Sequence, residues 1–519
     1  MMRFMRAPSS AVFAALLPLA AALALACRHA PPSPRAPIPA AAPAPRPDRP
    51  WSDEILYFVL LDRFADGDPS NDVKVDRSAP GAFHGGDLAG LTARLDEIAS
   101  LGATAIWVTP LVKNIDGFVS GAGFPDWAYH GYWADDLERL DQRFGTEAEL
   151  RTFVDECHRR GLRVLLDVVY NHAGYDSRYV CDPRFRGWTR NTQSGDCGED
   201  DVTSCVAGLP DFRTERPDVA RYLMDAQLGW ARRSGVDGFR LDTVKHVDHP
   251  FWAEHRRRTR AELGPWFFLL GEVWGGERDS LDAWFAPDEL DAGFDFSFQG
   301  STVGFLLGRG RTVAYERYLE GRQKVRPGHL LAHFLSTHDV TGALALLGGD
   351  RELFRLAAVL QLTTSGIPVV AYGEEVARDI GAWPRNRTDM PWGDRPIPAG
   401  AGVPRDEALR DFYRTLLALR RAHPALSRGA HEALATDGDL LVFARRDAAT
   451  RDAVVVAVNR GSAPARARLR PPEEWAGGDV RDVLGDDGGL ESAGGMLEVT
   501  VRPRSARALI VSPRSSGSP

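Results

Sequence analysis

Short apolar runs alternate with amphipathic stretches along most of this chain. The apolar runs have the length of buried strands, and eight of them follow one another at 55–62, 104–109, 163–170, 238–243, 267–273, 293–298, 331–337 and 367–373. Segments with helical periodicity lie between or after them, at 88–100, 147–160, 217–233, 250–262, 351–364 and 406–421. Apolar strands separated by helices indicate a parallel sheet that is covered on both faces.

The number of strand and helix units predicts the fold class. Eight units are the count of an α/β (β/α)8 TIM barrel, which we place at 51–425, and an open doubly wound sheet is the alternative. The segment 172–212 is too long for a simple connection, so we expect a small excursion domain, domain B, after the third strand. Beyond residue 425 apolar and polar positions alternate. This change predicts a C-terminal antiparallel β-sandwich domain at 426–513.

The N-terminus has the pattern of an export signal. Arg3 and Arg6 precede an apolar stretch too short for a comfortable membrane span, which is typical of a secretory signal peptide at 1–26. Cleavage before Cys27 would leave a cysteine able to carry a lipid, and residues 27–50 form a Pro/Ala-rich tether. We therefore expect an exported protein, lipid-anchored at the outer membrane or in the periplasm, with a lipid on Cys27 as its membrane contact. Cleavage and release of the protein is the alternative.

Composition and charge narrow the classes of partner. The chain has 519 residues, of which 44% are hydrophobic and 26% charged, values ordinary for a soluble globular protein. Its formal net charge is -8 and its arginines are scattered, so the sequence indicates no basic surface for a polyanion. Nucleic acid is therefore not an expected partner. The oligomeric state stays open, with a monomer expected.

The cysteines fit an oxidising compartment. Cys157 lies on the apolar face of a predicted helix and is expected in the core. Cys181, Cys197 and Cys205 crowd a loop rich in Gly, Asp and Thr, so one pair among them is expected to form a disulfide, and the spacing does not say which. A structural zinc site is the alternative, although the sequence contains no CxxC pair.

Three acidic residues each close a short apolar run. Asp242, Glu272 and Asp339 end the segments GFRLD, FLLGE and FLSTHD. A carboxylate at the end of a barrel strand stands at the rim where a substrate can reach it. Two carboxylates that face a glycosidic bond can act as acid and nucleophile, and a third can stabilise a cationic transition state. For each residue alone, a solvated or ion-paired acid is the alternative.

The segments around these acids resemble a known family. Four of them resemble the four sequence blocks of the α-amylase family of glycoside hydrolases, in the family's order: DVVYNH at 167–172, GFRLDTVKH at 238–246, GEVW at 271–274 and STHD at 336–339. LPDF at 209–212 resembles the family's fifth block, but differs from its common forms and leaves the subfamily open. The resemblance covers about 51–513 and implies the same barrel.

The resemblance implies a role for each acid. Asp242 would be the nucleophile, Glu272 the general acid and base, and Asp339 the residue that stabilises the transition state, with net retention of the α configuration. Arg240, two residues before Asp242 on the same strand, points to the same side and should keep that carboxylate ionised. A surface ion pair is the alternative for Arg240.

Further residues of these segments are implied to bind substrate. His172 and His338 would contact the hydroxyls of the sugar being cleaved, and otherwise would be buried, hydrogen-bonded histidines. His130 and Tyr132, in YHGYW, resemble the family's pair whose aromatic ring stacks on that sugar, and otherwise would belong to the core. The residues implied on the acceptor side are Lys245, His246 and Trp274.

Calcium is the implied cofactor. Asn171, Asp211 and the backbone carbonyl of His246 match the family's site between the excursion domain and the barrel, and oxygen ligands suit this cation. A second cluster resembles a calcium loop of cyclodextrin glucanotransferases and some bacterial amylases, with a solvated acidic turn as the alternative. Its residues are Asp66, Asp68, Asn71, Asp72, Gly85 and Asp87.

The resemblance implies an α-amylase, a retaining endohydrolase of α-1,4-glucosidic bonds in starch, glycogen or maltodextrins. Ala207 stands where cyclodextrin-forming relatives carry a bulky aromatic residue, which favours hydrolysis over cyclisation. Only a tether precedes the barrel, unlike the pattern of cyclomaltodextrinases and neopullulanases. The alternatives are a cyclomaltodextrinase or other maltodextrin-specific hydrolase, a 4-α-glucanotransferase, and a glycan-binding lipoprotein without turnover.

Overall fold

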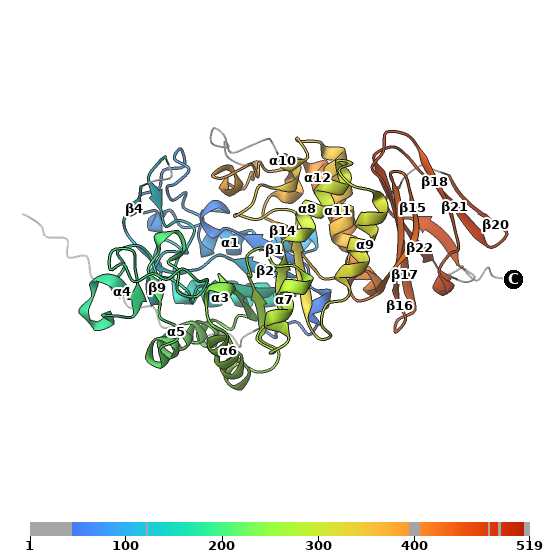
Figure 1. Cartoon of the computed structure of the whole chain (residues 1–519). Coiled ribbons are helices and arrows are strands. Elements are labelled where there is room, and N and C mark those ends of the chain that lie inside the picture. The colour runs from blue at the N-terminus through green and yellow to red at the C-terminus, as the bar shows by residue number, and fades with distance from the viewer. Residues whose placement is uncertain (1–43, 121–122, 394–404, 476–477, 486–488, 513–519) are drawn as a thin grey trace, which may run out of the picture. The chain divides into compact units, whose positions relative to one another are not determined.

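Eight parallel strands close into a barrel in the computed structural model, which describes residues 44–512 except 121–122, 394–404, 476–477 and 486–488 (Figure 1). The strand order is β1-β14-β13-β12-β11-β10-β7-β2, and β14 pairs in parallel with β1 to close the barrel. The strands are β1 (Leu56–Val59), β2 (Ala105–Val108), β7 (Arg163–Val168), β10 (Gly238–Leu241), β11 (Phe268–Gly271), β12 (Ala292–Asp295), β13 (Leu330–Phe334) and β14 (Ile367–Ala371). The predicted TIM barrel is confirmed, and the open sheet is excluded.

Helices cover the outside of the barrel (Figure 1). The predicted ones are α1 (Leu88–Ala93), α2 (Leu95–Leu101), α3 (Glu147–Arg159), α5 (Pro217–Ser234), α6 (His249–Glu262), α11 (Arg351–Thr363) and α12 (Glu407–Ala422). Capping side chains define where several helices begin. Thr146 and Glu149 form a capping box at the N-terminus of α3, and Asp350 caps the N-terminus of α11. The single helix predicted at 88–100 is divided at Arg94. Among the described helices of eight or more residues, three lie outside the prediction: α7 (Arg278–Phe285), α8 (Ser297–Leu306) and α9 (Thr312–Arg322).

Two excursions extend from the barrel strands. The sequence pattern did not indicate the first, in which β3 (Val112–Asn114) pairs with β6 (Ala134–Leu140), and β4 (Phe118–Val119) with β5 (Asp126–Trp127). The second is domain B, which contains α4 (Arg178–Cys181) and a small sheet of β8 (Thr189–Arg190) and β9 (Asp211–Phe212).

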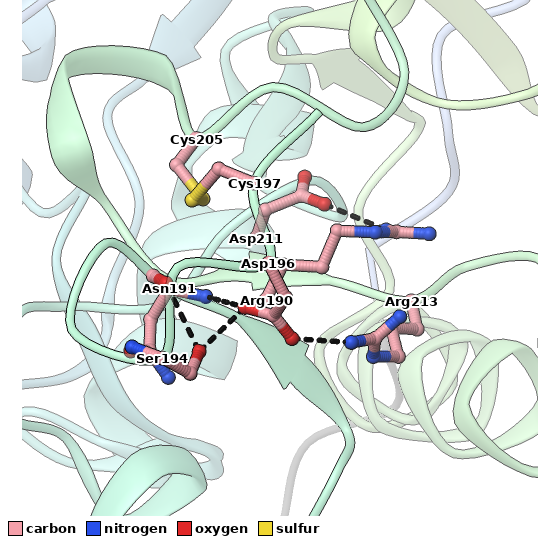
Figure 2. The surroundings of a disulfide bond; sticks show 8 residues. All are labelled: Arg190, Asn191, Ser194, Asp196, Cys197, Cys205, Asp211 and Arg213. Carbon is pink, nitrogen blue, oxygen red and sulfur yellow. Dashed lines mark hydrogen bonds and ion pairs between the residues drawn. A yellow bond between two sulfur atoms is a disulfide. The ribbon is translucent and has the colours of Figure 1, made fainter. Parts of the chain in front are cut away.

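A disulfide closes the central loop of domain B (Figure 2). Cys197 is bonded to Cys205, whereas Cys181 is exposed and unpaired. This pairing resolves the choice that the spacing left open and removes two of the three thiols that a zinc site would need. Cys157 is fully buried in α3, as predicted for a core residue.

The C-terminal domain is a sandwich of two antiparallel sheets. Their orders are β15-β16-β17-β22-β19 and β18-β21-β20. The strands are β15 (Ala430–Asp437), β16 (Leu440–Asp447), β17 (Asp452–Asn459), β18 (Ala465–Leu469), β19 (Asp479–Asp482), β20 (Leu490–Ala493), β21 (Met496–Val501) and β22 (Ser505–Ser512). Along β16, Leu440 packs into the core between the two sheets, while Leu441 packs into the core of the barrel. Since α9, α11 and α13 (Pro424–Ser427) also contact the larger sheet, this domain and the barrel share an apolar core.

Residues 44–50 lie against the amino-terminal ends of the barrel strands. Arg163, the first residue of β7, donates hydrogen bonds to the carbonyl oxygens of Pro47 and Arg49 at 2.8 and 2.5 Å. Arg49 in turn donates to the carbonyl of Thr104, which directly precedes β2. The predicted signal peptide, Cys27 and most of the tether lie outside the described residues and stay predictions. Among the helices that the structure describes, none combines the length and hydrophobicity required to cross a bilayer.

Candidate active site

Asp242, Glu272 and Asp339 lie at the same end of the barrel. Asp242 directly follows β10 and Glu272 directly follows β11, and their backbone amides donate to the carbonyls of Val168 (3.0 Å) and Leu241 (2.8 Å) on neighbouring strands. Asp339 lies in the turn after β13. Because the carboxyl ends of all barrel strands meet at one mouth, the topology brings the three carboxylates together.

One guanidinium joins the first two carboxylates. Arg240 is 1% exposed; its Nη1 lies 2.6 Å from Asp242 Oδ1, and its Nη2 lies 2.7 Å from Glu272 Oε1. The predicted contact between Arg240 and Asp242 is therefore present, and it is a buried pair rather than a surface one. The same Nη1 also donates to Asp167 Oδ1 at 3.0 Å. Since a guanidinium is small and planar, the Asp242 and Glu272 carboxylates face one small volume.

Two of the carboxyl groups lie in different electrostatic environments. Burial, together with the neighbouring charges of Asp242 and Asp339, raises the pKa of Glu272 to about 8. Burial also acts to raise the pKa of Asp339, but the cationic Arg387 and Arg240 outweigh it and hold that pKa below its usual value. Near neutral pH Glu272 is thus protonated and Asp339 ionised. Opposite protonation states of this kind allow one carboxyl to act as an acid and another as a charge.

A stacked pair of rings forms one wall of the mouth. The ring of Tyr132 lies parallel to that of His338, with centroids 5.4 Å apart, and its hydroxyl donates to Asp167 Oδ2 at 2.7 Å. His130 Nδ1 accepts from the backbone amide of Tyr132 at 3.1 Å and so supports this wall from behind. Burial lowers the pKa of His338 to about 3 and lowers that of His172 as well. Both imidazoles are therefore neutral hydrogen-bonding groups at this mouth.

Sequence reasoning missed two residues of this mouth. Arg387 Nη2 lies 3.0 Å from Asp339 Oδ1, and Arg387 Nε donates to the carbonyl of His338 at 2.9 Å. Arg387 follows the last barrel strand in a segment without a hydrophobic periodicity or a family block, so nothing in the sequence indicated that it belongs to the site. Asp167, which binds Arg240, Tyr132 and Trp107, lay inside the DVVYNH segment and could have been found there.

The turn after Asp242 contacts Glu272. Thr243 has a left-handed backbone conformation (φ 48°), and its amide donates to Glu272 Oε2 at 3.0 Å. Lys245 and His246 follow in the same turn. Trp274, two residues after Glu272, is 51% exposed. These residues gather on the Glu272 side of the mouth, whereas the stacked rings lie on the side of the third carboxylate.

Comparison with known proteins identifies the family. The family described as "Alpha amylase, catalytic domain" matches residues 58–195 and 184–391, which together make up more than half of the chain. The chain belongs to the α-amylase family. The resemblance carried by the sequence blocks is thereby confirmed, and the protein is a glycoside hydrolase of this family.

Relatives within the α-amylase family carry different names. A cyclomaltodextrinase of Bacillus sp. is 30% identical over 435 residues, covering 79% of this chain and 73% of that protein. The periplasmic alpha-amylase of Escherichia coli (strain K12) is 30% identical over 485 residues, covering 74% and 69%. The crystal structure of an Anoxybacillus α-amylase superposes with a TM-score of 0.77 at 29% identity, covering 90% of this chain and all of that one. Family membership therefore leaves the preferred substrate open.

The calcium site implied by the α-amylase family lies where domain B meets the barrel. The side-chain oxygen of Asn171 faces the carbonyl oxygen of His246 at 2.8 Å and Asp211 Oδ1 at 3.0 Å. Oxygens this close need a shared proton or a cation, supplied here by a rotated amide or by a hard cation among them. Arg190, opposite Asp211 on β8, binds only the other carboxylate oxygen, Oδ2, at 2.8 Å (Figure 2). This donor set fits Ca²⁺.

In the second implied calcium loop, some acidic groups are already satisfied by the protein. Asp87 is fully buried and accepts hydrogen bonds from the amides of Gly67 (3.0 Å) and Asp68 (2.9 Å) and from Asn71 Nδ2 (3.0 Å). Asp68 Oδ1 accepts from the amide and hydroxyl of Ser70. These two carboxylates therefore order the loop itself.

Other groups of the same loop are unsatisfied. Asp66, Asn71 and Asp72 each have a buried Oδ1 without a hydrogen-bond partner among the described residues. A Cβ on Gly85 would meet Asp72 Oδ1 at 2.4 Å, so glycine is needed there. In the described part of the chain, no group of three or more His, Cys, Asp or Glu side chains is arranged to hold a metal ion. A cation in this loop would thus also depend on amide or backbone oxygens.

Proposed function

We propose that this protein hydrolyses α-1,4-glucosidic bonds of starch, glycogen or maltodextrins with retention of the α configuration. The observation that carries this proposal is the single Arg240 guanidinium that contacts both Asp242 and Glu272. Retaining glycosidases have carboxyl groups about 5–5.5 Å apart, whereas inverting ones leave about 6.5–9.5 Å for a water molecule. Two carboxylates on one guanidinium support the shorter separation.

The roles follow from the positions and charges. Asp242 attacks the anomeric carbon while Glu272, protonated at neutral pH because its pKa is near 8, gives its proton to the leaving oxygen. Glu272 then takes a proton from the water that releases the sugar from Asp242. Asp339, held ionised, stabilises the positive charge that develops on the ring. Tyr132 offers its ring face to the donor sugar, and His338 can bond its hydroxyls.

An oligosaccharide-specific hydrolase is the second candidate. It is favoured by relatives named cyclomaltodextrinase and by Neopullulanase 2 of Thermoactinomyces vulgaris, which is 29% identical over 477 residues and of which 77% is covered. The small side chain of Ala207 in the domain B loop favours hydrolysis over cyclisation within either candidate.

A time course of products separates the candidates. An α-amylase cuts soluble starch internally, a cyclomaltodextrinase consumes a cyclodextrin while leaving starch nearly untouched, and a 4-α-glucanotransferase converts maltoheptaose into longer oligosaccharides early. NMR reports the anomeric configuration of the first product, and a β configuration there would contradict retention. Unchanged starch hydrolysis by Glu272→Gln would return the protein to the class of glycan-binding proteins.

Calcium is proposed at both implied places as a structural ion. Asn171, Asp211 and the His246 carbonyl would hold it at the junction, and Asp66, Asn71 and Asp72 in the loop. A hard cation there would screen oxygens that otherwise face one another and would bind only the folded chain.

Export with a lipid on Cys27 is proposed from the sequence of residues 1–27. Radiolabelled palmitate should enter the wild-type protein in cells and should not enter Cys27→Ser. Labelling of both proteins, or of neither, would favour another route.

A further inference from the structure

We propose that the loop closed by the Cys197–Cys205 disulfide is a specificity element for the acceptor sugar, and that Asp201 transmits its effect. The inference rests on the proposed function, because it concerns the sugar that leaves from the same site. A loop with this role positions groups for the leaving sugar and leaves the bond-breaking residues untouched.

The loop is braced internally as well as by its disulfide (Figure 2). Asp200 Oδ1 accepts from the amides of Val202 and Thr203 at 2.9 Å, and Asp200 Oδ2 accepts from the Thr203 hydroxyl at 2.7 Å. The amide of Gly198 donates to the carbonyl of Thr203 at 2.8 Å. The backbone around Asp201 is therefore held in one conformation although it lies at the surface.

The base of the loop is also fixed to domain B. Asp196, next to the disulfide, accepts from the amide of Asn191 at 3.0 Å and pairs with Arg213 at 2.5 Å (Figure 2). The loop is thus anchored where the chain enters it, in addition to the disulfide.

Asp201 connects this loop to the turn after the nucleophile. Its carbonyl oxygen lies 2.7 Å from Nδ1 of His246, and since a carbonyl only accepts, Nδ1 carries the proton. Its carboxylate Oδ1 lies 3.7 Å from Nζ of Lys245. One residue of the loop therefore orients two consecutive polar side chains of the barrel.

Lys245 and His246 stand where the leaving sugar must pass. A general acid lies beside the oxygen that it protonates, so groups beyond Glu272 face the leaving group. The turn that carries Lys245 and His246 begins with Thr243, whose amide bonds Glu272 Oε2. The stacked rings of Tyr132 and His338 lie instead beside Asp339, on the donor side.

Two substrates isolate the acceptor side. Maltotetraose places a sugar in the leaving position, whereas α-maltosyl fluoride releases only a fluoride ion, so that formation of its glycosyl-enzyme needs neither an acceptor sugar nor a proton from Glu272. For the double variant Cys197→Ser/Cys205→Ser, which loosens the loop as a whole, we expect kcat/KM on maltotetraose to fall about tenfold. Asp201→Ala removes only the exposed carboxylate beside Lys245 and leaves the carbonyl contact with His246, so we expect a smaller fall of about two- to fivefold. The rate on the fluoride should stay unchanged in both variants.

Cys181→Ser is the matched control, because Cys181 is an unpaired cysteine of the same domain; it should change neither rate. Asp201→Ala keeps the disulfide and therefore tests the inference even if the double variant fails to fold. An equal loss on both substrates, or no loss on either, would overturn the inference alone. A wild-type protein inactive on both substrates would overturn the proposed function and the inference with it.

Discussion

At the scale of single residues, one buried cation organises the site. Arg240 contacts Asp167, Asp242 and Glu272, all nearly excluded from water. Removing a buried charge that pairs with others leaves those charges uncompensated, which is costly. The spacing of Arg240 and Asp242 along one strand made this contact predictable from the sequence.

The raised pKa of Glu272 predicts an alkaline limit to activity. A general acid works only while protonated, so kcat/KM on maltotetraose should fall as pH rises through about 8, the pKa of Glu272. Fluoride leaves without a proton, so the same limb should be weak or absent with α-maltosyl fluoride. Glu272→Gln should lower kcat/KM on maltotetraose by about 10²–10⁴-fold. Superimposable pH profiles for the two substrates would argue against Glu272 as the acid.

Arg387 is predicted to support Asp339. Arg387→Gln removes the cation 3.0 Å from the Asp339 carboxylate and should reduce kcat/KM by about 10–100-fold, the loss of one hydrogen bond between charged groups. Arg385→Gln is the control: this exposed arginine of the same loop pairs with Asp379 instead. Equal activity of the two variants would show that Arg387 has no part in the reaction.

The contacts that could not be predicted from the sequence depend on the folded conformation of the chain. Arg387 is 48 positions from Asp339 along the chain, and only the folded barrel brings them together. No local pattern encodes such a contact, whereas Asp242 and Glu272 each end a visible apolar run. Disulfide pairing was similarly beyond the sequence, because loop conformation decides which of three nearby cysteines meet.

At the scale of elements, strand positions were predicted well and strand ends less well. The apolar run 163–170 continues past β7, which ends at Val168, because Val169 and Tyr170 stay buried without a ladder partner. Tyr170 packs against helix α6, where its ring contacts Trp252 and His255, and this burial prolongs the apolar pattern beyond the ladder. Helix α8 was missed because its sequence, SFQGSTVGFL, contains two glycines and lacks a clear polar face.

Calcium bound in the loop at 66–87 is predicted to raise the melting temperature of the protein. If Ca²⁺ binds the folded loop, an excess of about 100 times its Kd should stabilise the protein by about 2.7 kcal/mol and raise Tm. Asp72→Asn should reduce this rise, because it removes charge from one of the unsatisfied oxygens. Asp76→Asn is the control, since the carboxylate of Asp76 accepts hydrogen bonds from Ser78 at the surface of the same loop. Calorimetric scans with Ca²⁺ and with a chelator measure this rise in Tm. An equal rise in Asp72→Asn and Asp76→Asn would exclude Asp72 as a ligand.

At the scale of the whole molecule, the barrel and the β-sandwich are expected to unfold together. Leu441→Ala opens a cavity in the core that the two share and should cost about 2–5 kcal/mol. Leu440→Ala costs a similar amount but opens its cavity between the two sheets of the sandwich. If the two domains unfold together, calorimetry should therefore show a single transition whose Tm both variants lower by similar amounts. A barrel transition that Leu441→Ala leaves unmoved would separate the two domains energetically.

The arginine contacts of residues 44–50 decide at which end of the barrel this segment lies. They hold this segment against the amino-terminal end of the barrel, opposite the end that carries the three carboxylates. The described chain therefore enters the catalytic domain at the end of the barrel away from the active site, so that this segment leaves the path to the three carboxylates open.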